Sequence, residues 1–338
     1  MTPAELTERW TDLAAARRST SGTERRRLDA EAAVDVFACI FWPRGRSGLL
    51  IEGVACVSGL SDRVPRCRGV RVLLDTEEIE GDRERASLVI ILEEERLREI
   101  FAVLSADLVN AIVAEPDPAT ALRRCVDRLC MWQGLFDRIA PEGLSEQRQR
   151  GLFGELVVLE QRFLADGALL EGVSAWVGSD SAHQDFRLGR LAVEVKTSLA
   201  KRHARIAISN EKQLDERPHD PLILASVRLD ESEPHGISLP DLVARLRARL
   251  AGDEPASRLF DDRLLLADYL DVHAPIYEAH RYQVVSTRWF RVEGDFPRLT
   301  DANLPAGVGD ITYSIIADDL GAWELADDAM IALIGDAA

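Results

Sequence analysis

Residues 183–198 read HQDFRLGRLAVEVKTS, and this stretch decides the fold prediction. Gly189-Arg190 suits the two-residue turn of a β-hairpin, because glycine at the first central position favours a type II′ turn. In the resulting register, Asp185 faces Glu194 across the two strands. Strand alternation sorts the side chains into two faces. The apolar face holds Phe186, Leu188, Leu191, Val193 and Val195, and the other face holds His183, Asp185, Arg187, Ala192, Glu194 and Lys196.

The polar face of this hairpin is a poor arrangement for a purely structural pair of strands. Directly opposed side chains lie about 4.5–5.5 Å apart at Cβ, and like charges there destabilise a sheet. Two converging carboxylates do suit a hard divalent cation such as Mg²⁺, which takes oxygen ligands. The pattern therefore indicates a metal site at Asp185 and Glu194. A solvated lattice of ion pairs on an exposed strand face is the alternative interpretation.

A lysine stands beside these acids in a chain that otherwise avoids lysine. Of the 41 basic residues only Lys196, Lys201 and Lys212 are lysines. The lysine ammonium is a compact charge on a flexible stem, so it can orient a water molecule or offset charge on a phosphate. The planar fork of arginine would instead bind the carboxylates and compete with a metal. Chemistry at Lys196 is one explanation, and a surface feature shared by the three lysines is the other.

A helix upstream of the hairpin supplies a third acid. Ser145 is a suitable N-cap and Gly167 a suitable C-terminal residue for a helix that includes GLFGELVVLEQRF. Glu155 lies at the border of the apolar stripe of this helix, where a partly buried carboxylate needs a partner such as a metal. Glu160 lies nearer the centre of the stripe and is the alternative candidate. A boundary residue with its carboxylate in water is the structural interpretation of Glu155.

The segment after the hairpin holds candidate contacts to phosphate. ISNEKQL, residues 208–214, predicts a strand that passes into a helix, with Asn210 as the N-cap and Gln213 in its capping box. Gln213 is also a candidate to reach a phosphate or a metal-bound water. His183 is interpreted as a packing or phosphate-contacting residue. A basic run that suits DNA backbone contacts, or a solvated loop, consists of Lys201, Arg202, His203 and Arg205.

The bulk properties describe an ordinary globular protein with an acidic balance. The composition is 46% hydrophobic and 29% charged, and the net charge is −17. Because such a chain repels polyanions overall, binding to nucleic acid has to depend on a local site. The five cysteines form no CxxC pair, which argues against structural zinc. The amphipathic N-terminal segment lacks a signal-peptide core and no apolar run is long enough to span a membrane, so we expect a cytoplasmic location.

The chain divides into two predicted domains. After a polar break, RRSTSGTERRR at 17–27, residues 31–94 hold short strand-like runs and residues 95–140 have helical spacing, which predicts an antiparallel sheet backed by helices. Strands alternate with helices over 145–252, as in a mixed α/β sheet. The tail at 259–325 alternates short strands with loops. We therefore predict an N-terminal α+β domain at 1–140 and a second domain at 141–338.

The second domain resembles the restriction-endonuclease-like PD-(D/E)XK phosphodiesterase superfamily. The hairpin motif, GLSEQRQRGLFGELVVL, ISNEKQL, FPRL and GVGDITYSI are similar to a bacterial family of PD-(D/E)XK motif proteins often found among phage-defence and restriction gene clusters. The likeness spans about residues 90–316. It implies a metal-dependent DNA nuclease core, with a mixed sheet of four to five strands and helices on both sides.

The resemblance also assigns roles to individual residues. Gln184 stands where the motif has proline, which leaves the neighbouring acid in place. The residues that carry the motif are Asp185, Glu194, Lys196, the helical acid Glu155 and, as in some relatives, Gln213.

The function that the resemblance implies is an Mg²⁺-dependent DNA endonuclease of a restriction or phage-defence system. Mn²⁺ is a possible substitute for Mg²⁺. The metal would be held by Asp185, Glu194 and the carbonyl of Val195, and Glu155 would complete the site or recruit a second ion. The expected partners are DNA and either a second copy in a possible homodimer or other defence subunits. The net charge and the missing proline favour an alternative, which is a non-catalytic subunit of a defence complex. A second alternative is an acidic interaction protein with a purely structural hairpin.

Overall fold

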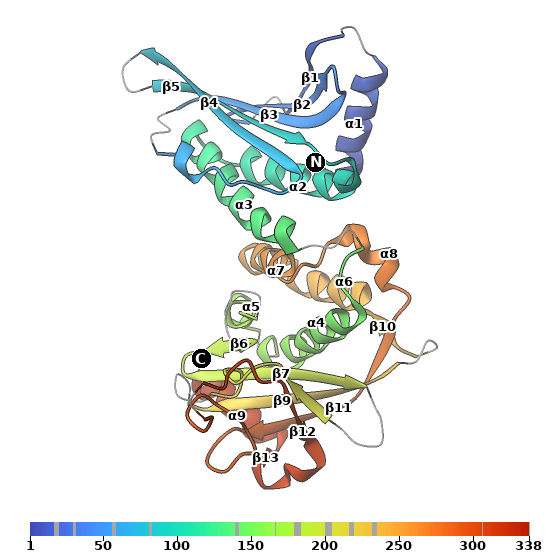
Figure 1. Cartoon of the computed structure of the whole chain (residues 1–338), viewed down its shortest axis with the longest axis vertical. Coiled ribbons are helices and arrows are strands. Elements are labelled where there is room, and N and C mark those ends of the chain that lie inside the picture. The colour runs from blue at the N-terminus through green and yellow to red at the C-terminus, as the bar shows by residue number, and fades with distance from the viewer. Residues whose placement is uncertain are drawn as a thin grey trace. The chain divides into compact units, whose positions relative to one another are not determined.

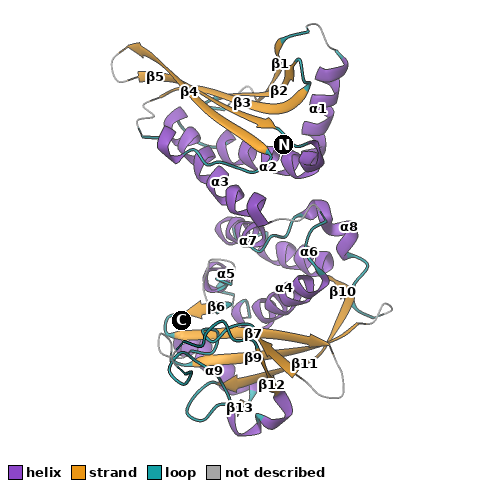
Figure 2. Ribbon diagram, viewed as in Figure 1, coloured by secondary structure: helices purple, strands orange, loops and turns teal. Residues whose placement is uncertain are grey.

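The computed structural model describes residues 1–16, 20–29, 32–55, 59–80, 83–138, 142–165, 167–178, 184–199, 205–215, 220–231, 235–305 and 307–337. The chain forms two compact units, Met1–Pro141 and Glu142–Ala338, and each is described by itself. Figure 2 shows that both units combine helices with strands, so the protein is a mixed α/β chain. Among the described helices, none has the length and apolar character that a membrane span requires.

The first unit is an antiparallel sheet with helices on one face (Figure 1). The strand order is β1-β2-β3-β5-β4. Trp10 stacks on Phe101 at 5.4 Å between ring centroids and donates its indole N–H to the carbonyl of Gly48, which joins two helices to the sheet. The elements are α1 Pro3–Ala15, β1 Gly22–Asp29, β2 Asp35–Trp42, β3 Arg46–Ala55, β4 Val70–Glu80, β5 Arg83–Leu92, α2 Arg98–Val113 and α3 Pro118–Arg138.

Strand β1 lies where the sequence predicts only a polar break. It is an edge strand that pairs with β2 alone, so little of its length needs apolar side chains. Charge pairs join it to the neighbouring strands instead: Arg25 contacts Glu52 at 3.0 Å, and Arg27 contacts Asp35 at 2.5 Å. The hydrophobic period that identifies a strand is therefore missing, although the strand is present.

The second unit is built on a mixed sheet of six strands. Its order is β10-β11-β9-β7-β6, with β13 paired to β11, and β7 and β9 run parallel while the other pairs are antiparallel. The strands are β6 Phe186–Leu188, β7 Leu191–Leu199, β9 Leu222–Glu231, β10 Ile237–Ser238, β11 Arg281–Arg291 and β13 Glu324–Leu325, and a separate pair consists of β8 Arg205–Ile208 and β12 Tyr313–Ile316. The helices are α4 Glu146–Val158, which continues as a π-helical turn Leu159–Phe163, α5 Leu169–Ala175, α6 Leu239–Leu250, α7 Glu254–Leu266, α8 Ala274–Tyr277 and α9 Asp327–Ala337.

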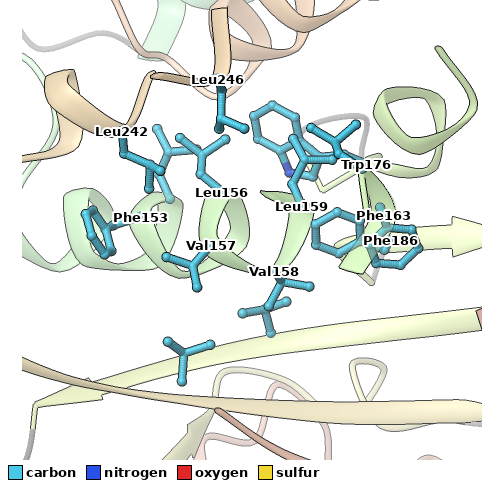
Figure 3. Packing of buried hydrophobic residues seen from close by; sticks show 14 of the residues in the cluster. Phe153, Leu156, Val157, Val158, Leu159, Phe163, Trp176, Phe186, Leu242 and Leu246 are labelled. Carbon is cyan, nitrogen blue, oxygen red and sulfur yellow. The ribbon is translucent and has the colours of Figure 1, made fainter. Parts of the chain in front are cut away.

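The two faces of this sheet are covered differently. One face packs on the helices: Val157 and Val158 of α4 point toward the strands, and Leu156 points toward α6 (Figure 3). On the other face, Ala192 and Leu224 pack in a second apolar cluster with residues of β8 and β12. The expectation of helices on both sides is therefore wrong for this second face, because a two-stranded sheet and neighbouring turns cover it. The tail at 259–325 also contains most of α7 and the short α8, where the sequence predicts only strands and loops, and α9 lies beyond it.

Helix α4 is held close to β7, and this places the candidate site. Its N-cap is Ser145, whose hydroxyl accepts from the N–H of Arg148 at 3.4 Å, as predicted. A Cβ added to Gly154 would overlap the hydroxyl of Thr197 on β7. Glycine therefore allows the close approach of helix and strand, and the acid that follows it, Glu155, is carried toward the sheet.

Candidate active site at the α4–β7 junction

The β6–β7 hairpin has the predicted register. Phe186 pairs with Val193, and Gly189 has φ +54° in the turn. One residue beyond the last pair, the N–H of Asp185 donates to the carbonyl of Val193 at 3.0 Å. Asp185 therefore lies at the level of Glu194, on the strand opposite.

The position of Asp185 is fixed by its backbone and by its side chain. Its carbonyl accepts from the N–H groups of Val177 and Gly178 at 2.8 and 3.0 Å. One carboxylate oxygen, Oδ2, accepts from the N–H of Val195 at 2.7 Å. The carboxylate is thus held in one orientation by the strand that carries the other two motif residues.

Glu194 and Lys196 form a buried ion pair on β7. The distance between Lys196 Nζ and Glu194 Oε1 is 2.7 Å, and the side chain of Glu194 is 2% exposed. Its second oxygen, Oε2, is buried and has no hydrogen-bond partner in the described part of the chain. A solvated lattice of surface ion pairs does not fit this burial, because surface charges keep their water. An unpartnered buried carboxylate oxygen needs a donor or a cation.

Glu155 supplies the third carboxylate from α4. Its Oε2 accepts from the indole N–H of Trp176 at 2.8 Å. A Cβ added to Gly178 would lie 2.9 Å from Asp185 Oδ1 and 3.2 Å from Glu155 Oε2, so both acids crowd the same glycine. The alternative acid, Glu160, points elsewhere and contacts Arg245 at 2.7 Å.

A cavity of about 590 Å³ opens on these groups. The three carboxylates line it together with three cationic side chains and several hydroxyl and amide groups. These lining residues include Gln147, Arg150, Glu155, Asp185, Glu194, Val195, Lys196, Thr197, Ser198, Arg205, Ser209 and Gln213.

The carboxyl groups hold their protons more tightly than usual. Burial, and then the charge of Asp185, raise the pKa of Glu155 to about 8. Burial raises the pKa of Asp185 to about 6, although the Val195 N–H and Lys196 act in the opposite direction. Burial, followed by the charge of Asp185, raises the pKa of Glu194 well above its usual value. Burial is the main physical cause at all three groups, and the charge of Asp185 adds to it at Glu155 and Glu194; a divalent cation would favour the charged carboxylates instead.

Replacing Glu155 by glutamine is expected to stabilise the metal-free protein at high pH. Folding raises the pKa of Glu155 from 4.5 to about 8, so the folded protein holds this proton more tightly than the unfolded chain. The stability that this proton gives is fully present below pH 4.5, and it is lost as the pH rises through 8. Urea unfolding in EDTA should show Glu155→Gln about 1–3 kcal/mol more stable than the wild type at pH 9.

The same comparison at pH 4 should show no such gain. Glu160→Gln is the matched control, since Glu160 follows on the same helical segment and pairs with Arg245. The free energy of unfolding of Glu160→Gln should be less than about 1 kcal/mol below that of the wild type at either pH. A Glu155→Gln protein as stable as the wild type at pH 9 would contradict the raised pKa.

The predicted substrate-binding residues are only partly placed. Gln213 and Arg205 line the cavity. His183, Lys201 and Arg202 lie outside the described residues. Gln184, in the position of the motif's proline, is 2% exposed, donates to the carbonyl of Lys212 and accepts from Arg187. It therefore ties the hairpin to the segment that carries Gln213.

The helix predicted from Asn210 is wrong. Residues 211–214 form a turn, in which Asn210 Oδ1 accepts from the N–H of Lys212 at 3.0 Å and Gln213 Oε1 accepts from the N–H of Ser209 at 2.9 Å. One turn is too short to recover the cost of helix nucleation. Side-chain bonds of the kind that cap helices close this turn instead.

Several residues of the site carry no motif that sequence reasoning could use. Trp176 and Gly178 follow α5 in the segment WVG at 176–178, and they matter because they touch Glu155 and Asp185. Arg150 lies five residues before Glu155 on α4, and because that spacing does not put two side chains on one face of a helix, it is no signal that both line the cavity. The contacts themselves depend on how α4 and the loop meet β7.

These residues suit a site in which Mg²⁺ is held by one or two carboxylates and by water, and not a site in which protein ligands alone surround the ion. Among the described residues, no three His, Cys, Asp or Glu side chains converge closely enough to hold an ion by themselves. Mg²⁺ commonly takes one or two carboxylates and keeps several waters. Asp185 and Glu194, with the free Glu194 Oε2, meet that smaller requirement.

Comparison with known proteins agrees with this geometry. Residues 6–318 match the model of the family DUF4420, whose description is "Putative PD-(D/E)XK family member". No curated protein and no solved structure matches the chain. The match confirms the resemblance to the superfamily, whose members are typically nucleases, whereas the association with phage defence stays a prediction.

Proposed function

We propose that this chain, which belongs to the DUF4420 family of PD-(D/E)XK proteins, is a metal-dependent DNA endonuclease. The observation that carries the proposal is the buried end of the cavity. There Asp185, Glu194 and Glu155 line one cavity beside Lys196, and one oxygen of Glu194 is buried without a partner among the described residues. Such an arrangement is costly for a fold and useful for holding a cation against a phosphate.

Asp185 and Glu194 would hold Mg²⁺, with the carbonyl of Val195 as a further ligand and Glu155 completing the site or recruiting a second ion. Bound there, Mg²⁺ polarises a phosphoryl oxygen and lowers the pKa of a coordinated water. Mn²⁺ would substitute for it. The N–H of Val195 keeps the Asp185 carboxylate oriented for this role.

Lys196 acts on the substrate side of the same site. Its ammonium, 2.7 Å from Glu194 Oε1, is positioned to hold the attacking water and to offset the charge that develops on the phosphate. Trp176 holds Glu155 by a hydrogen bond, so that carboxylate keeps its place before an ion binds. The substrate phosphate would enter through the open side of the cavity.

Metal titration tests the first step directly. The wild type is expected to bind Mg²⁺ and Mn²⁺ and to release protons at pH 7, because the raised pKa values of Glu155 and Glu194 mean that bound protons must leave. Calorimetry in two buffers of different ionisation enthalpy measures both quantities. Asp185→Asn and Glu194→Gln should each lower the affinity about 10-fold or more, while Glu160→Gln should not.

Cleavage of plasmid DNA with Mg²⁺ tests the second step. A wild type that binds the ion and cuts DNA meets the proposal. Ion binding without cleavage of single- or double-stranded DNA would favour the alternative, a non-catalytic subunit of a defence complex. If the wild type binds no ion, the nuclease proposal is wrong, and the alternative of an interaction protein with a purely structural hairpin is favoured.

The biological setting is a further part of the proposal. A restriction or phage-defence system is the setting that the resemblance implies, and cutting of both strands by one site per chain would require a second copy. Efficiency-of-plating assays with and without the gene, and the mass of the protein in solution, test these two points.

A further inference from the structure

We infer that Arg150 and Arg205, with the hydroxyl of Ser198, form a phosphate-binding subsite in the cavity that the carboxylates line. Its ligand would be a phosphate of the same nucleic-acid strand, next to the one that is cut. The inference rests on the proposed function. It explains how a protein with a net charge of −17 would bind a polyanionic substrate.

The position of Arg150 follows from the geometry of α4. Gln147, Gly151 and Glu155 follow one another at intervals of four residues and Arg150 lies three after Gln147, and all four line the cavity, as residues three and four apart on a helix do. Five residues of helix separate Arg150 from Glu155 by about 7.5 Å along the axis. Successive phosphates of one strand advance by about 3.4 Å along the duplex axis, so the two residues are far enough apart to contact different phosphates. Arg150 and Arg205, called the basic end below, line the same cavity as the three carboxylates.

The charges at the basic end are available to a ligand. The acid nearest Arg150 is Glu146, whose side chain is 65% exposed, at 3.7 Å. Such a solvated pair is weak and can exchange for a phosphate. Arg205 has no acidic partner within the described ranges of the chain, although the net charge of the protein is −17. Two guanidinium groups that face one cavity suit a phosphate, which they bind with paired N–H donors.

Ser198 adds a neutral donor to the lining of the same cavity. It follows Lys196 by two residues on β7, so both side chains leave the strand on the same side. Its hydroxyl oxygen is buried and has no hydrogen-bond partner in the described part of the protein. Serine hydroxyls commonly contact phosphate oxygens. If Ser198 had only a structural role, its buried hydroxyl would be expected to bond to another protein group.

The experiment measures binding separately from cleavage. Fluorescence anisotropy of a labelled DNA duplex in Ca²⁺, over a range of salt concentrations, compares the full-length wild type with Arg150→Gln and Arg258→Gln. Arg258 is the matched control, because it pairs with Glu254 four residues away on an exposed helix face, as Arg150 does with Glu146. Circular dichroism confirms that each variant folds.

Arg150→Gln is expected to weaken binding about 10-fold and to reduce the slope of log affinity against log salt by about 0.9, the value for one lost phosphate contact. Arg258→Gln should change neither quantity.

The subsite is overturned if Arg150→Gln binds duplex as the wild type does, if Arg258→Gln loses as much affinity, or if the wild type does not bind duplex at all. Failure of the proposed function gives a different pattern. In that case the Arg150-dependent binding is present, and no DNA is cut in Mg²⁺.

Discussion

Replacing Lys196 by methionine should lower DNA cleavage by about a thousandfold or more while Mg²⁺ still binds. Lys196 Nζ lies 2.7 Å from Glu194 Oε1, so its ammonium faces the place where an attacking water and a phosphate would meet. Loss of a positioned donor at such a place commonly costs 10²–10³-fold, and here a full charge is lost as well. Metal affinity should be unchanged or higher, because the ammonium repels the ion and occupies one carboxylate oxygen.

Loss of cleavage with retained metal binding would show that Lys196 has a chemical role and not only a structural one. Single-turnover cleavage measures the first quantity and calorimetry the second. Lys212→Met is the matched control, since Lys212 is exposed and its side chain does not line the cavity. Lys196→Arg should also fail to restore cleavage, because the guanidinium fork would bind Glu194 instead of releasing it to a metal. Cleavage at the wild-type rate by Lys196→Met would remove the lysine from the mechanism.

Replacing Phe186 by alanine should lower the free energy of unfolding of the second unit by about 3–5 kcal/mol. Phe186 is fully buried and stacks on Phe163 with ring centroids 4.4 Å apart. Figure 3 shows both rings at the end of α4, beside Trp176. The residue before Phe186 is Asp185, so the stack anchors the strand that carries this acid. Loss of the ring should therefore also weaken Mg²⁺ binding.

Urea unfolding followed by circular dichroism measures this loss, and calorimetry follows the metal. Arg187→Ala is the control on the same strand, because Arg187 is exposed and gives up only a hydrogen bond to Gln184; its free energy of unfolding should fall by less than about 1 kcal/mol. Phe186→Leu should fall between the two variants, since it keeps most of the apolar volume. Equal stability of Phe186→Ala and the wild type would mean that the hairpin is not anchored by this stack.

The acidic balance of the chain has a local exception at the proposed site. Arg150, Lys196 and Arg205 face one cavity, and a bound divalent ion would add two further charges beside the carboxylates. The field that a substrate meets there is therefore set by these few groups and not by the net charge of −17. For this reason we expect affinity for DNA to depend steeply on both salt and divalent ions.

The sequence by itself determined the hairpin. A glycine turn and strict alternation of side chains are local properties, so the pairing of Phe186 with Val193, and with it the level of Asp185 and Glu194, follows from residues a few positions apart. The same holds for the N-cap of α4 at Ser145. Local chemistry was misleading only where it was ambiguous, as at Asn210, where capping side chains close a turn, and at β1, where an edge strand needs no apolar period.

Only the tertiary structure decided which helical acid belongs to the site and what surrounds it. Glu155 and Glu160 are both plausible from periodicity, and the choice depends on Gly154, which lets α4 approach β7, and on Arg245 of α6, which binds Glu160. The second apolar cluster buries the polar strand face and raises the pKa of Glu194. Contacts between segments far apart in the chain depend on packing, and no periodicity within one segment encodes them.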